Sequence, residues 1–152
     1  MAAAHGEHDA LQAALDAGHP LDASIAAALG DGAALEPLLA SASPAQIQNA
    51  FGLAVINAHL ACATIALDAG ADVNAFLPVH AHSTALHHAA GTDDVATIAL
   101  LLARGARTDL RDTLWNATPL AWAIDGNRAA ATAALERLEP PVAPGAPERP
   151  AD

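Results

Sequence analysis

Four of the eight histidines lie between positions 80 and 88, and three of them are spaced suitably for a metal site. His80 and His82 are separated by one residue, which places both rings on the same side of an extended segment. His88 adds a third nitrogen, and zinc accepts three imidazoles and one water in catalytic sites. The sequence therefore offers His80, His82 and His88 as candidate ligands for zinc or another divalent metal.

A second kind of chemistry would combine an imidazole with a carboxylate. His88, Asp125 and Asp112 are the candidate catalytic residues, because such groups exchange protons near neutral pH. The chain contains no His-Glu-x-x-His motif, no Gly-x-Ser-x-Gly turn and no phosphate-binding loop. An enzymatic function is therefore open but not favoured, and no cofactor beyond the candidate metal is suggested.

The helices that would position these residues follow a fixed period. Thr84 and Thr118 are 118 − 84 = 34 positions apart, and a period of this length is typical of stacked repeats. Both threonines are suitable N-caps, and Pro119 fits the first position of a helix. Gly105 fits the residue that ends a helix in a left-handed conformation. The spacing thus predicts two helices in each repeat.

The repeat that begins at Thr84 resembles the ankyrin repeat. The segment 84–90, TALHHAA, matches the family pattern Thr-Pro-Leu-His-x-Ala-Ala, with Ala85 where proline is usual. The resemblance covers roughly residues 22 to 138 and is most specific in the second half. It implies an all-α, ankyrin-like helix-pair solenoid with short β-hairpin loops. It also implies that the ring of His87 hydrogen-bonds its own turn and the neighbouring repeat.

The remaining repeats are expected from weaker matches to the same pattern. Besides the repeat over 84–105, the chain offers a capping half repeat at 9–17 and repeats at 22–42, 43–74 and 118–138. This makes about four repeats and one N-terminal capping half repeat.

Residues 1–139 are predicted to form a single ankyrin-like repeat domain. Five prolines then fall between positions 140 and 150, a composition that neither builds a helix nor packs a core. Residues 140–152 are therefore predicted to be a disordered, proline-rich tail.

The resemblance also implies a binding face, because ankyrin-like stacks bind partners on the concave side lined by hairpins and first helices. Trp122 lies 122 − 88 = 34 positions after His88 and takes the equivalent place one repeat later. Exposed tryptophans are frequent binding anchors. With Asp112 nearby, we expect one surface to hold six side chains: His80, His82, His88, Trp115, Trp122 and Asp125.

Two functions fit that surface. The first is a module that recognises a protein partner, as the resemblance implies. The alternative is a small-molecule or metal-dependent site built from the same histidines, tryptophans and Asp125. Such a site could be catalytic.

Composition and charge limit the classes of partner. The chain has 152 residues and a formal net charge of −11, which argues against nucleic acid or an anionic membrane as partner. It contains no apolar run of about 18 residues, so no membrane span is expected. The single Cys62 excludes an internal disulfide and fits a reducing compartment. With no signal peptide recognised, a cytoplasmic location is expected.

Overall fold

The computed structural model describes residues 9, 12–13, 16–18 and 21–137, which contain eight α-helices and no strand. The predicted all-α class is confirmed for these residues. The helices form four consecutive pairs: α2 (Ala23–Leu29) with α3 (Gly32–Leu39), α4 (Pro44–Ile56) with α5 (Leu60–Asp68), α6 (Ala85–Gly91) with α7 (Val95–Ala103), and α8 (Pro119–Asp125) with α9 (Ala129–Glu136).

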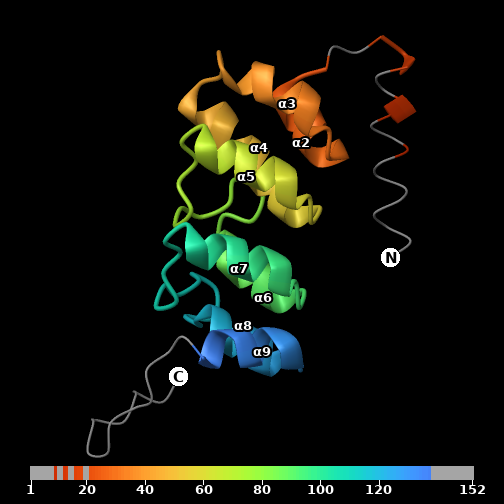
Figure 1. Ribbon diagram of the computed structural model, residues 1–152. Coiled ribbons are helices and arrows are strands. Elements are labelled where there is room, and N and C mark those ends of the chain that lie inside the picture. Colours follow the sequence, from red (N-terminus) through yellow and green to blue (C-terminus); the bar gives the residue numbers. More distant parts are fainter. Residues whose placement is uncertain (1–8, 10–11, 14–15, 19–20, 138–152) are drawn as a thin grey trace, which may run out of the picture.

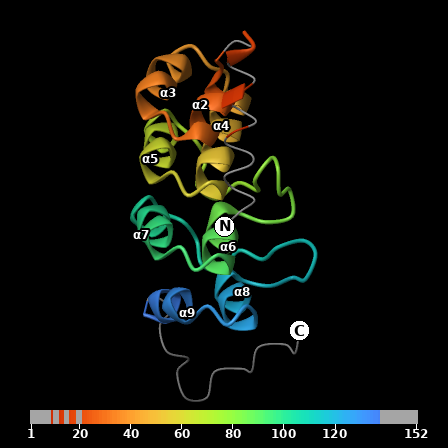
Figure 2. The ribbon, with the colours of Figure 1, turned by 90° about the vertical axis from the view of Figure 1, so that its right-hand side faces the viewer.

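The four pairs stack in one direction and form two columns of helices (Figure 1). The first helices α2, α4, α6 and α8 pack on one another, and so do the second helices α3, α5, α7 and α9. Two long loops, 72–83 and 106–117, project from the side of the first-helix column (Figure 2). The stack therefore contains the predicted helix pairs and presents two neighbouring loops on one side.

The turn inside each pair has the same backbone geometry. After the first helix one residue takes a left-handed conformation, and the next N–H donates to a carbonyl five positions back, as from Asp94 N to Ala89 O at 2.9 Å. This arrangement satisfies carbonyls at the helix C-terminus. The left-handed residues in the four turns are Gly30, Ala58, Asp93 and Asn127.

Each first helix begins at a polar side chain that caps its N-terminus. The Thr84 hydroxyl accepts from the backbone N–H of His87, and the Thr118 hydroxyl accepts from that of Ala121. Ser43 forms a complete capping box with Gln46, directly before Pro44. These caps fix the start of each first helix, and hence the direction in which the preceding loop enters the stack.

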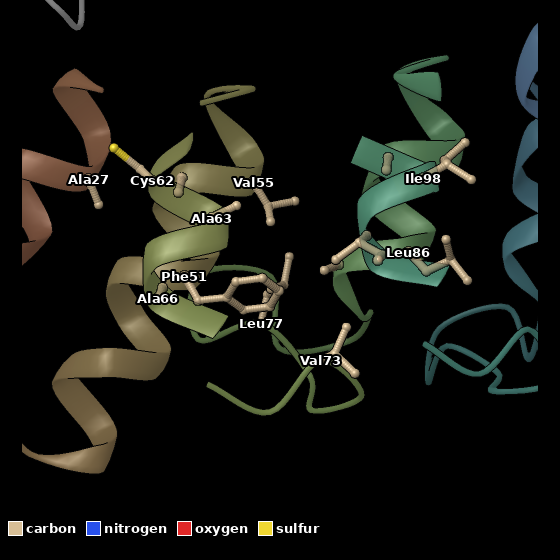
Figure 3. Packing of buried hydrophobic residues seen from close by; sticks show 14 of the residues in the cluster. Ala27, Phe51, Val55, Cys62, Ala63, Ala66, Val73, Leu77, Leu86 and Ile98 are labelled. Carbon is tan, nitrogen blue, oxygen red and sulfur yellow. The ribbon is translucent and has the colours of Figure 1, made fainter. Parts of the chain in front are cut away.

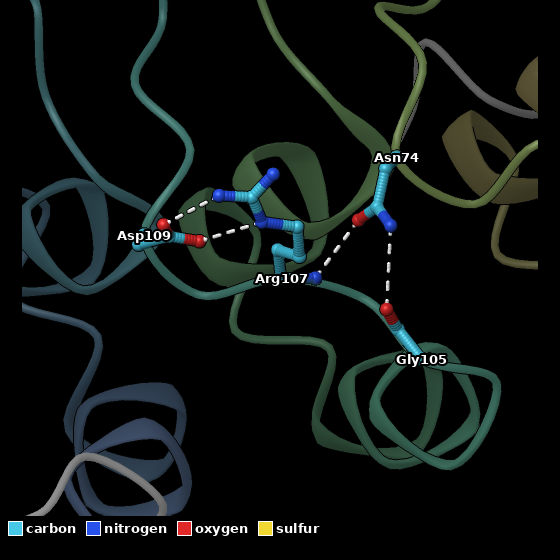
Figure 4. A network of polar contacts seen from close by, with 4 residues as sticks. All are labelled: Asn74, Gly105, Arg107 and Asp109. Atoms are coloured by element: carbon cyan, nitrogen blue, oxygen red, sulfur yellow. Dashed lines mark hydrogen bonds and ion pairs between the residues drawn. The ribbon is translucent and has the colours of Figure 1, made fainter.

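The short β-hairpins expected from the sequence are not confirmed in the two long loops. Within the described residues the only β-type pairing is an isolated bridge between Phe76 and Thr84. Side-chain amides fix the loops instead. The Asn74 carbonyl oxygen accepts from Arg107 N at 2.8 Å, and its amide donates to Gly105 O at 3.3 Å (Figure 4). The Asn74 side chain thus ties the start of the second loop to the first.

The core is assembled from small and medium-sized apolar side chains. Ala63 and Ala66 are buried, and they let neighbouring helices approach closely. Leu77 points from the first long loop into the cluster that contains Phe51 (Figure 3). Cys62 is also fully buried, and burial raises the pKa of its thiol, so it is a packing residue. The loop is therefore anchored to the core as well as to its neighbour.

Some sequence predictions fall partly outside the described residues. Of the capping half repeat at 9–17, Asp9, Gln12, Ala13 and Asp16 are helical, and Gly18 is left-handed. The proline-rich segment 140–152 lies outside the described part of the chain. None of the described helices is long and apolar enough to cross a membrane.

Stability should depend on the interior of the stack. Leu101 in α7 is fully buried, whereas its neighbour Leu102 is only partly buried. We expect Leu101→Ala to lower the free energy of unfolding by about 2–5 kcal/mol, because it leaves a cavity. Urea unfolding followed by circular dichroism measures this, with Leu102→Ala as the matched control. Equal losses in the two variants would contradict the described burial.

Candidate functional site

Six aromatic rings from the two loops and from helices α6 and α8 form one connected group, here called the ring cluster. Each member contacts at least one other ring at a centroid separation of 5.3–6.0 Å. Because the contacts link residues far apart in the chain, the cluster joins the third and fourth helix pairs. Its members are His80, His82, His87, His88, Trp115 and Trp122.

Three rings at the centre of the cluster touch one another. The ring of His82 stacks on Trp122 with centroids 6.0 Å apart and planes 26° apart. It meets Trp115 edge to face at 6.0 Å and 87°. The two indoles lie 5.7 Å apart at 72°. Edge-to-face and offset-stacked pairs are the favourable aromatic geometries, so this triangle holds its members in fixed relative orientations.

A second branch of the cluster consists of histidines. The ring of His80 is stacked on that of His88, with centroids 5.8 Å apart and planes 19° apart, and lies 5.9 Å from His82. His88 is half-buried, and its pKa is lowered mainly by desolvation and next by His80. The imidazole of His88 is therefore held in its neutral form.

Asp112 lies behind the tryptophans and organises the second loop. Its side chain is 2% exposed. One oxygen accepts from the backbone N–H groups of Leu114 at 2.8 Å and Trp115 at 2.6 Å. The other accepts from Ala117 N at 3.0 Å and from the indole N–H of Trp122 at 2.9 Å. A single carboxylate thus shapes the loop, holds the backbone of Trp115 and bonds the indole of Trp122.

The environment of Asp112 keeps this carboxylate charged. Burial by itself raises the pKa of its carboxyl group, but the hydrogen bonds from Trp115, Trp122, Ala117 and Leu114 outweigh burial and lower the pKa below its usual value. The group is therefore an anion at neutral pH, surrounded by N–H donors.

His87 connects the third helix pair to the second loop. Its Nδ1 accepts from Thr84 N at 3.2 Å, so its proton lies on Nε2, which donates to Ala117 O at 2.9 Å. These bonds reach its own turn and the neighbouring repeat, as expected from the sequence. The ring is fully buried, and desolvation is the main reason that its pKa is lowered. His87 is therefore a neutral structural residue.

The position of Trp122 is fixed by packing as well as by Asp112. A Cβ atom added to Gly91 would lie 3.2 Å from the indole, so the glycine leaves room for the ring on α6. The two loops are also tied directly, because Thr113 N donates to His82 O at 3.0 Å. Trp122 and its surroundings therefore support the exposed part of the cluster.

The tips of the two loops expose apolar side chains to solvent. Trp115 is 65% exposed and Leu114 is 61% exposed, and Phe76 and Val79 on the neighbouring loop are also exposed. We call these four residues the loop-tip surface. Leu114, Phe76 and Val79 were not among the residues predicted from the sequence. Their only signal was the presence of large apolar residues in segments expected to be loops.

The structure brings together most of the predicted site residues. His80, His82, His88, Trp115 and Trp122 share the ring cluster, and Asp112 bonds two of its members, as described above.

Asp125 does not join them. It is the exposed last residue of α8, and no hydrogen bond or ion pair of its side chain is found within the described residues. Asp112, the other candidate catalytic carboxylate, is buried and fully engaged by the loop.

The predicted three-histidine metal site is not assembled. Among the described residues, no three His, Cys, Asp or Glu side chains are arranged so that they could hold a metal ion. His80, His82 and His88 contact one another through ring stacking and an edge contact instead. The arrangement therefore favours binding through ring faces over metal ligation.

A comparison with the models of known protein families finds no match, and no curated protein is significantly similar to the chain. Function is therefore inferred from the geometry and chemistry of the ring cluster.

The state of His87 can be measured directly. Because its folded pKa is lowered, the folded protein binds fewer protons than the unfolded chain below about pH 6.5. We expect the free energy of unfolding to decrease as the pH falls from about 6.5 through this lowered pKa. NMR titration should show His87 neutral at about pH 6.5, with its proton on Nε2. A His87 ring that titrates at or above about 6.5 would contradict its described burial.

Proposed function

We propose that this chain is an ankyrin-like module that binds a protein partner through the loop-tip surface and the adjoining first helices. The observation that supports this proposal is the exposure of Trp115. This large aromatic side chain is 65% exposed although the residues around it are held firmly. Large apolar side chains that are exposed on a surface can mark an interaction site. Tryptophan is also enriched among the residues that dominate binding energy.

The support beneath Trp115 favours recognition of a partner. Its backbone N–H donates a hydrogen bond to the buried carboxylate of Asp112, and its indole contacts the rings of Trp122 and His82. A side chain held in place before association loses less conformational freedom on binding. Trp122, half-buried and bonded to Asp112, belongs to this support more than to the contact surface.

The arrangement of the stack extends the surface. Both loops project on the same side of the first-helix column (Figure 2), and side chains of α6 and α8 complete the ring cluster. A protein partner can therefore contact two loops and two helices at once. This matches the use of hairpins and first helices that the sequence resemblance implies.

The proposal predicts different effects for the two tryptophans. Trp115→Ala should weaken association by about 2 kcal/mol or more while leaving the unfolding midpoint nearly unchanged. Trp122→Ala should lower the stability itself, because the indole packs on Gly91 and bonds Asp112. Thermal unfolding and calorimetric titration with the purified partner measure the two quantities. The matched control is Ile124→Ala, since Ile124 is 52% exposed on α8 but outside the ring cluster.

The partner can be identified by placing a photo-crosslinking amino acid at position 114 and, as control, at position 124. We expect a protein to be captured from an extract of the source cells at position 114 only. A captured protein that binds the wild type and Trp115→Ala with equal affinity would overturn the proposal.

A further inference from the structure

We infer that the partner docks with a cationic side chain, arginine in preference to lysine, placed against the exposed indole of Trp115. The inference rests on the proposed function and names the chemistry of its partner. Three independent features lead to it: the distribution of charge along the chain, the anion behind the tryptophans, and the open face of the ring cluster.

Charge is distributed unevenly along the chain. Its six cationic residues are all arginines, and the first of them is Arg104. The stretch 21–103, which includes the first of the two loops, therefore contains no lysine or arginine. Over that stretch the acidic residues are Asp22, Asp31, Glu36, Asp68, Asp72, Asp93 and Asp94. With a net charge of −11, the long-range field attracts a cationic segment and repels an acidic one.

Three arginines in or beside the second loop have partners within the chain. Arg104 pairs with Asp68 at 2.7 Å, and Arg107 forms a two-point pair with Asp109 at 2.7 and 3.0 Å (Figure 4). Arg111 donates to the carbonyl of Asn116 at 2.7 Å.

Asp112 places a negative charge behind the indoles. Its four hydrogen-bond donors described above are all neutral N–H groups, so they stabilise the anion without cancelling its charge. One of them is the indole N–H of Trp122, and donation to a carboxylate makes that ring richer in electrons. A cation resting on the cluster therefore feels both the ring faces and the buried carboxylate.

The open indole suits arginine better than lysine. A guanidinium group is planar, so it can lie flat on an indole face while its edge N–H groups still bond water or carbonyl oxygens. An ammonium group is more strongly hydrated and loses more of its hydration on contact. Trp115 is 65% exposed, which leaves ring surface for such stacking next to His82.

The inference is tested with the peptides acetyl-Gly-Arg-Gly-Arg-Gly-amide and its counterparts with lysine or glutamine in place of arginine. The chain has only two tryptophans, so the indole N–H signals in a proton–nitrogen NMR spectrum report the site directly. We expect the arginine peptide to shift these signals with saturation, about tenfold more tightly than the glutamine peptide, with lysine intermediate. Raising the salt from about 50 to about 300 mM should weaken the arginine peptide more than the glutamine peptide.

Trp115→Ala should abolish saturable binding of the arginine peptide, observed through the Trp122 signal, whereas Ile124→Ala should leave it unchanged. Equal binding of the arginine and glutamine peptides, or no binding up to about 10 mM, would overturn the inference. So would an unaltered affinity in Trp115→Ala.

The two proposals fail in different ways once the crosslinked partner is known. A partner whose binding is lost in Trp115→Ala, but which tolerates replacement of its contacting arginines by glutamine, leaves the proposed function intact and overturns the cationic anchor. A partner that binds the wild type and Trp115→Ala with equal affinity overturns the proposed function itself.

Discussion

The packing of the fourth helix pair on the third depends on the hydrogen bonds of the buried His87 ring. One nitrogen accepts from the Thr84 turn at the start of α6, and the other donates to Ala117 at the end of the second loop. Since α8 begins directly after Thr118, this bond sets where the fourth pair lies on the third. The ring can serve both partners only while it is neutral, and burial, the largest influence on its pKa, favours that neutral state even though the hydrogen bond to Ala117 raises the pKa.

The candidate site depends on that placement through Asp112. The loop that ends at Ala117 turns back on the Asp112 carboxylate, which in turn holds Trp115 and Trp122. Trp122 reaches across to Gly91 on the preceding first helix. The same contacts that join two helix pairs therefore also present an indole to solvent. Trp122 is therefore part of the packing between the helix pairs, whereas Trp115 is the indole that is mostly exposed.

The sequence predicted the helices well because their signals are local and repeated. Caps such as Thr84 and Thr118 recur with the period of the stack, and the offset between His88 and Trp122 correctly placed both in one cluster. Asp125 lies three residues after Trp122, close to one helical turn, but it is the exposed last residue of α8, and none of the described ring contacts or hydrogen bonds links its side chain to the cluster. The role of Asp112 in organising the loop had no periodic signal in the sequence, because that role depends on irregular backbone.

The histidines show why spacing alone did not decide the chemistry. Metal ligation requires nitrogen lone pairs that converge on one point, whereas His80 and His88 lie face to face and His82 stacks on Trp122. A cluster built in this way, over a buried carboxylate and beside an exposed indole, is suited to holding a flat cationic group by its face. We propose that the loops that were expected to supply ligands for a metal instead supply a platform for a side chain.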